Sequence, residues 1–104
     1  MTGHFLAATA ARNPDLVIEA SDALRWYRAS PAAARGFCAV CGSTLFWRAD
    51  ARDYVSIAAG SIDGPTGLKV VQHIHTADKG DYYALDDGVP QSAVAMQPVT
   101  APWR

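Results

Sequence analysis

The order of hydrophobic and polar positions along the chain predicts many short strands separated by turns. Apolar, aromatic and β-branched residues gather in short runs, and turn-forming residues close each run. These runs are residues 4–11, 16–19, 24–28, 44–47, 54–59, 69–75 and 82–85. No stretch has the amphipathic spacing of a long helix, so the sequence predicts an all-β fold of two small antiparallel sheets.

The stretches between these runs are predicted to be irregular. Residues 32–34 are three alanines after Ser30-Pro31, and we expect a connection there because so short a run beside proline cannot nucleate a helix. Polar residues 48–53 indicate a hairpin loop, and the glycine-rich residues 60–67 indicate a surface loop. Residues 86–104 contain three prolines and no clear period, which predicts an extended tail of a single domain over residues 1–104.

The aromatic residues of the predicted strands are expected to form the core. Trp26 and Tyr27 lie in one predicted strand, and Phe46 and Trp47 lie in another. Aromatic residues on neighbouring strands are more often buried than exposed for ligand stacking, so we interpret all four as core residues. Aspartates of the loops, such as Asp87, are interpreted as solvated turn residues whose carboxylates bond their own backbone.

Composition and charge narrow the function classes. The chain has 104 residues, is 50% hydrophobic and has a formal net charge of -1. A charge this close to zero gives no electrostatic footprint for nucleic acid or for an acidic membrane surface. No apolar stretch approaches the roughly 18 residues that span a bilayer, and the N-terminus lacks the pattern of a signal peptide. We therefore expect a soluble, cytoplasmic protein that binds neither nucleic acid nor membrane.

Both cysteines of the chain lie in one motif, Cys38-Ala39-Val40-Cys41-Gly42. In C-x-x-C-G the tight turn directs two thiols at one point, and the glycine lets the backbone fold over the sulfurs, as in a zinc knuckle. This spacing is poor evidence for a disulfide scaffold, and it fits a reducing compartment. The motif predicts Cys38 and Cys41 as metal ligands. A structural zinc ion takes about four protein ligands, so these two supply half of a site.

Two interpretations of the thiols stay open at this point. Cys38 and Cys41 are either free, partly buried thiols, or zinc ligands whose missing partners come from elsewhere, for example from the same motif of a second copy. The histidines are further nitrogen donors, and His73 and His75 would share one face of their predicted strand. Histidines with this spacing also occur by chance, so we interpret them and His4 as packing or hydrogen-bonding residues.

Several motifs, taken in order, resemble one family. They are Thr2-Gly3-His4-Phe5, Leu24-Arg25-Trp26-Tyr27, Arg35-Gly36-Phe37-Cys38-Ala39-Val40-Cys41-Gly42-Ser43, Ile57-Ala58-Ala59-Gly60-Ser61-Ile62-Asp63, and His73-Ile74-His75 through Asp81-Tyr82-Tyr83. With these motifs the chain resembles the glutathione-dependent formaldehyde-activating (GFA) enzymes, a family that includes centromere protein V. The resemblance extends over nearly the whole chain, so it is far more specific than the C-x-x-C motif alone.

The resemblance implies a GFA-like (Mss-four-like) β-fold and a zinc-dependent carbon–sulfur lyase or synthase that joins formaldehyde and glutathione into S-hydroxymethylglutathione. In fuller members, one structural zinc takes two cysteines from an N-terminal C-x-C-G stretch and two from a later C-x-x-C, which Cys38 and Cys41 match. The C-x-C-G stretch, and the C-x-C-x-x-C of the catalytic zinc, would precede the part that matches Thr2-Gly3-His4-Phe5. The resemblance therefore implies an N-terminally shortened domain here.

Two functions are consistent with these motifs. The first is a GFA-type lyase acting on a glutathione adduct, with catalytic residues that this sequence does not identify. The second is a non-catalytic zinc-binding or dimerising β-module. A shortened domain would expose strand edges and apolar surface, so we expect a homodimer at least. The expected partners are a small thiol such as glutathione and a second copy of the chain.

Overall fold

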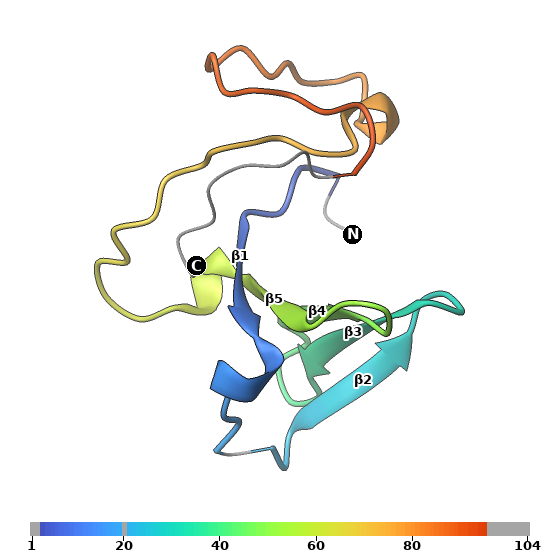
Figure 1. The fold of residues 1–104 in the computed structure, drawn as a ribbon, viewed down its shortest axis with the longest axis vertical. Helices are drawn as coiled ribbons and strands as arrows, with labels where there is room; N and C mark the ends of the chain where they lie inside the picture. Colours follow the sequence, from blue (N-terminus) through green and yellow to red (C-terminus); the bar gives the residue numbers. More distant parts are fainter. Residues whose placement is uncertain (1–2, 20, 96–104) are drawn as a thin grey trace. The chain divides into compact units, whose positions relative to one another are not determined.

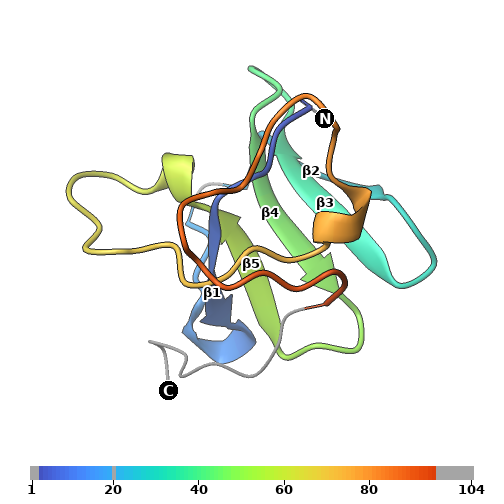
Figure 2. The same ribbon diagram turned by 90° about the horizontal axis from the view of Figure 1, so that it is seen from above.

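The computed structural model describes residues 3–19 and 21–95. Their strands form one five-stranded antiparallel sheet (Figure 1), made of β1 (Ala8–Arg12), β2 (Leu24–Arg28), β3 (Ala33–Cys38), β4 (Thr44–Ala49) and β5 (Tyr54–Ala58). The order across the sheet is β1-β5-β4-β3-β2, so β1 and β2 are its edges (Figure 2). The described residues also form the 3-10 helices η1 (Asn13–Asp15), η2 (Ala59–Ser61) and η3 (Thr76–Asp78).

The described residues group into two compact units. The sheet unit is residues 7–64, and the second unit combines residues 3–6 with residues 65–95, which are mostly irregular. The sheet unit contains both cysteines, and the second unit contains all three histidines. No helix within the described part of the chain is long and apolar enough to cross a membrane.

The all-β class expected from the sequence is confirmed, with a difference in the number of sheets. The described strands lie in one sheet, where two were expected, because the strand predicted at residues 69–75 does not form. This segment makes one isolated parallel bridge, between His73 and Gln91. His75 has a φ of 53°, in the left-handed region, which ends the alternation of an extended strand. The prediction that His73 and His75 share a strand face was therefore wrong.

Strand β3 was not among the strands predicted from the sequence. The connection predicted at residues 32–34 was wrong in part, because Ala33 and Ala34 open β3 and are only 7% and 3% exposed. The Ser30 hydroxyl accepts hydrogen bonds from the backbone N–H groups of Ala32 and Ala33, at 3.3 and 3.1 Å. This local bond closes the turn after the proline and starts the strand. Ala33 and Ala34 then pair with Ala49 and Arg48 of β4, and Ala34 also pairs with Arg28 of β2.

One face of the sheet is packed around Gly36 of β3. Trp26 of β2 and Phe46 of β4 are both opposite Gly36, and their rings stack with centroids 6.0 Å apart. A Cβ at Gly36 would lie 3.1 Å from both Trp26 Cζ3 and Phe46 Cβ. The glycine therefore lets the two rings approach each other. The Arg48 guanidinium covers the same indole, with its Cζ 4.1 Å from the ring centroid.

The opposite face exposes Tyr27 and Trp47, which are 61% and 38% exposed. Their interpretation as core residues was therefore wrong, whereas Trp26 and Phe46 are half-buried. Successive side chains of a strand point to opposite faces of a sheet. Residues that pack on one face of the sheet can therefore bury only one aromatic residue of each consecutive pair, Trp26 of Trp26-Tyr27 and Phe46 of Phe46-Trp47.

Candidate metal centre

The two cysteines lie at the connection between β3 and β4. Cys38 is the last residue of β3, and Thr44 is the first residue of β4. The Gly42 N–H donates to the Cys38 carbonyl at 2.7 Å, and the Cys38 N–H donates to the Ser43 carbonyl at 2.9 Å. Gly42 has a φ of 80°, which a residue with a Cβ rarely adopts. We expected the turn to run directly into a buried strand: β4 does follow it directly, but its residues are half-buried or exposed.

Hydrogen bonds within the turn favour the thiolate form of Cys41. The Cys41 N–H donates to Cys38 Sγ at 3.5 Å, and the Cys41 thiol donates to the Ser43 hydroxyl at 3.2 Å. The side-chain hydrogen bond with Ser43, followed by the backbone bond of the same residue, lowers the pKa of the Cys41 thiol, because once the thiol is deprotonated its sulfur accepts from the Ser43 hydroxyl and from the Ser43 N–H. The thiolate is the form of cysteine that binds metals, so the turn is well suited to hold one.

The turn is open to solvent. Val40, between the two cysteines, is 85% exposed. Cys41 is exposed, Cys38 is half-buried, and both thiols are free. A metal ion, or another protein that supplies further ligands, can therefore approach the Cys41 sulfur from solvent.

The donor set fits half of a zinc site. Soft thiolates suit zinc, and structural zinc sites take about four protein ligands in a tetrahedral arrangement. Across residues 3–19 and 21–95, no group of three or more histidine, cysteine, aspartate or glutamate side chains is placed to hold a metal ion. The other residues of the chain contain none of these four types. Cys38 and Cys41 can supply two ligands, and any further ligands must come from outside the sheet unit.

The histidines of the second unit make ring contacts and hydrogen bonds. The His73 side chain is 5% exposed, and its Nε2 lies 2.9 Å from Asp87 Oδ2. The Phe5 ring lies edge-on to His73, with centroids 5.3 Å apart. The His4 ring lies 4.4 Å from the Tyr83 ring, centroid to centroid. These contacts fit the interpretation of His4 and His73 as packing and hydrogen-bonding residues.

Asp87 has a partner that the sequence did not indicate. Its Oδ1 accepts the Val89 N–H at 3.0 Å, as expected of a turn aspartate, while Oδ2 faces His73. The hydrogen bond with His73, followed by that with Val89, lowers the pKa of Asp87 because both favour the carboxylate. No local pattern links the aspartate to the histidine, because the two residues are 14 positions apart.

Replacing Asp87 by asparagine is expected to loosen the bonds around His73 in a pH-dependent way. Because the folded protein lowers the pKa of Asp87, its carboxylate contributes stability that is fully present above the unfolded pKa of about 3.9. That stability is lost as the pH falls through the lower, folded pKa. The His73 amide donates to the Pro90 carbonyl at 2.9 Å, and the Ser92 amide donates to the His73 carbonyl at 2.8 Å. Native-state hydrogen exchange measures how often each of these two bonds opens.

At about pH 6 these two amides should exchange faster in Asp87→Asn than in the wild type, and this difference should be smaller at about pH 3. Asp86→Asn, which alters the exposed neighbouring aspartate, should exchange as the wild type does. An equal difference between Asp87→Asn and the wild type at both pH values would contradict the role given to the Asp87 carboxylate.

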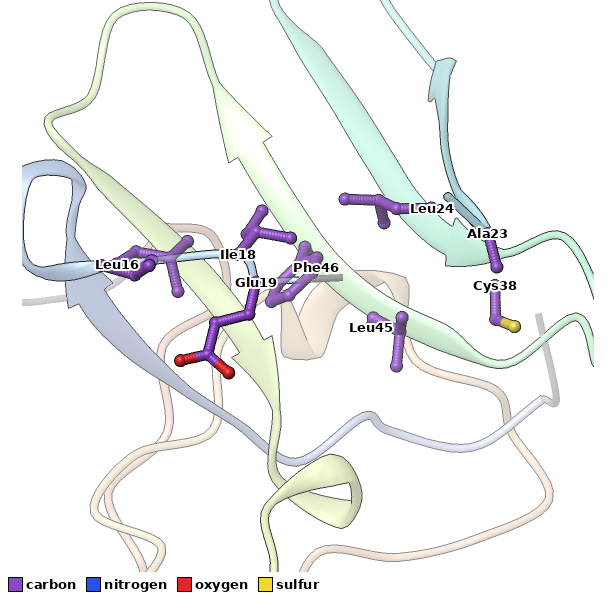
Figure 3. A pocket seen from close by; sticks show the side chains of 9 residues that line it. Leu16, Ile18, Glu19, Ala23, Leu24, Cys38, Leu45 and Phe46 are labelled. Atoms are coloured by element: carbon purple, nitrogen blue, oxygen red, sulfur yellow. The ribbon is translucent and has the colours of Figure 1, made fainter. Parts of the chain in front are cut away.

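A small apolar cavity adjoins the turn within the sheet unit (Figure 3). Its volume is about 280 Å³. It is lined by Leu16, Val17, Ile18, Glu19, Ala23, Leu24, Cys38, Leu45 and Phe46. Figure 3 shows Cys38 beside Ala23, with its sulfur directed away from Phe46. Residues 16–19 were predicted as a strand, but they form no strand and instead line this face of the sheet.

Comparison with known proteins supports the resemblance seen in the motifs. A family model described as Glutathione-dependent formaldehyde-activating enzyme matches residues 1–78. The matched part includes the whole sheet unit and the C-x-x-C turn. No curated protein and no solved structure matches the chain.

Proposed function

Because this chain belongs to the glutathione-dependent formaldehyde-activating enzyme family, we propose that it binds zinc and acts in the carbon–sulfur chemistry of glutathione and formaldehyde. In that reaction the glutathione thiol adds to formaldehyde. A sulfur–carbon bond forms, the thiol proton passes to the carbonyl oxygen, and the product is S-hydroxymethylglutathione; the reverse reaction cleaves the same bond. Cys38 and Cys41 would hold a structural zinc ion, and no catalytic residue is assigned.

The observation that carries this proposal is the hydrogen-bonded C-x-x-C turn. The Cys41 N–H is directed at Cys38 Sγ, and the Ser43 hydroxyl beside Cys41 Sγ favours the thiolate of Cys41. Zinc bound there would fasten the connection between β3 and β4, and binding to the folded state stabilises that state by mass action. Free thiols of this kind also fit a reducing compartment such as the cytoplasm.

The enzymatic part is tested by exchange NMR of glutathione and formaldehyde at equilibrium. The zinc-loaded chain is expected to raise the rates of adduct formation and cleavage by the same factor, because a catalyst lowers one barrier for both directions. Cys38→Ser should lack this effect. Ser61→Ala, which removes a hydroxyl that donates to the Ala58 carbonyl at 2.7 Å, should retain it. Unchanged rates with the zinc-loaded wild type would contradict catalysis.

The number and exposure of the thiols favour a second function. The chain contains two cysteines, and the turn that carries them is exposed at Val40 and Cys41. In a non-catalytic β-module, two copies of the chain could share one zinc ion through Cys38 and Cys41 of each, giving four thiolates. One zinc ion per two chains, together with unchanged exchange rates, would favour this dimeric module over the enzyme.

A further inference from the structure

The strands of the sheet carry five arginines and no acidic residue. These arginines are Arg12, Arg25, Arg28, Arg35 and Arg48. The acidic residues lie outside these strands, and they bring the formal net charge of the whole chain to -1. The sheet is therefore positively charged within a nearly neutral protein.

Three of the five arginines have partners within the sheet unit. Arg28 Nη1 forms an ion pair with Asp50 Oδ2 at 2.7 Å. Arg48 covers the indole ring of Trp26. Arg25 Nη1 donates to two backbone carbonyls, at 2.8 and 3.0 Å. These contacts account for the three guanidinium groups as structural interactions.

Arg35 has no such partner and lies in an exposed row across three strands. It is directly opposite Tyr27 of β2 and Trp47 of β4, so the three side chains project from one face. All three are exposed, Tyr27 by 61% and Trp47 by 38%. Among the described residues, the Arg35 guanidinium makes no ion pair, side-chain hydrogen bond or ring contact.

Such a row can recognise a carboxylate next to a flat group. A guanidinium offers a carboxylate two parallel hydrogen bonds, and the tyrosine and tryptophan rings on either side can pack against planar peptide groups. Arg25 lies two residues before Tyr27 in β2, on the same face, and adds a second positive charge. Adjacent strands are about 4.8 Å apart, so the row spans roughly 10 Å, which matches a short peptide and not an extended nucleic acid strand.

We propose that the Tyr27, Arg35 and Trp47 row binds a carboxylate of a small peptidic thiol such as glutathione. This inference rests on the proposed function, because it locates a binding site for the carboxylates of that substrate. The row lies on the face opposite Trp26 and Phe46, and it provides charge complementarity for an anionic ligand. In this site the Arg35 guanidinium would bind the carboxylate of the ligand.

Isothermal titration calorimetry with reduced glutathione at low ionic strength tests the site. Arg35→Gln is expected to raise the Kd by about tenfold or more, because it removes a charge-assisted hydrogen-bonding group. Arg35→Lys, which keeps the charge and loses the planar fork, should give an intermediate Kd. Arg28→Gln changes an arginine on the opposite face, paired with Asp50, and should bind as the wild type does. Glutathione with both carboxylates esterified should bind the wild type as weakly as glutathione binds Arg35→Gln.

Several outcomes would overturn the inference. They are an equal Kd for the wild type and Arg35→Gln, the absence of glutathione binding to the wild type, and tight binding of a single-stranded oligonucleotide that glutathione does not displace. Zinc content is measured on the same samples. Loss of glutathione affinity in Arg35→Gln with zinc content unchanged supports this site, whereas a wild type that binds glutathione through Arg35 and takes up no zinc contradicts the proposed zinc function alone.

Discussion

Cys38→Ser and Cys41→Ser should each bind zinc at least about 100-fold more weakly than the wild-type chain. Each substitution removes one of the two sulfur atoms of the C-x-x-C turn. Changes to groups that merely support a metal ligand already reduce affinity by about 10- to 100-fold, and loss of the ligand itself should cost more. Competition with a coloured chelator measures the affinity. Cobalt substitution adds a second readout, because the intensity of the thiolate charge-transfer band should fall in each variant.

The matched control for both variants is Ser61→Ala. It alters a hydroxyl of the same unit that bonds the Ala58 carbonyl and lies outside the turn, so its zinc affinity should equal that of the wild type. A serine variant that binds zinc as tightly as the wild type does would show that the metal site lies elsewhere.

Gly36→Val should destabilise the chain by about 1–2 kcal/mol. A single Cβ at this position would already lie 3.1 Å from Trp26 and from Phe46, and valine adds two methyl groups between their rings. Overpacking of this kind costs about 1–3 kcal/mol, and the lower conformational freedom of valine relative to glycine offsets part of that cost. Urea unfolding followed by tryptophan fluorescence measures the difference in the free energy of unfolding.

Gly60→Ala provides the comparison for this prediction. No atom lies within 4 Å of a Cβ built at Gly60, so alanine fits there, and the variant should be as stable as the wild type or up to about 1 kcal/mol more stable. A Gly36→Val chain that unfolds with the wild-type free energy would show that the stacking of Trp26 and Phe46 does not depend on the glycine.

Local sequence signals identified much of the sheet unit. The alternating run at residues 24–28 and the apolar runs at residues 44–47 and 54–59 correspond to β2, β4 and β5. The C-x-x-C-G motif indicated a tight turn before β4, and the structure has that turn with Gly42 at positive φ. These features depend on residues adjacent in sequence, so periodicity and turn chemistry are sufficient to find them.

The features that were missed depend on contacts between distant residues. Ala33 and Ala34 resemble a connection until pairing with β2 and β4 places them in the sheet. Tyr27 and Trp47 resemble core residues until the single sheet assigns them to the opposite face from their neighbours. The bond between His73 and Asp87 joins positions within an irregular segment, where no repeating pattern exists to signal it.

The candidate metal site could be identified only in part for the same reason. Two ligands with a fixed spacing form a recognisable sequence motif, whereas ligands supplied by another segment or another chain form no local motif with them. The unpaired Arg35 was not recognised either. Its exposure between two aromatic side chains follows from the register of three strands, which the sequence does not specify by itself.

The most direct test of the account is the zinc-to-chain ratio of the purified protein, measured by elemental mass spectrometry together with the molar mass from light scattering. With two thiolates per chain, we predict about one zinc ion per two chains and a mass of two chains that falls to one when zinc is chelated. One zinc ion per monomeric chain would support the metal site but contradict the sharing of one ion between two chains. A chain purified without bound zinc, which also takes up none when zinc is added, would contradict the assignment of Cys38 and Cys41 as metal ligands.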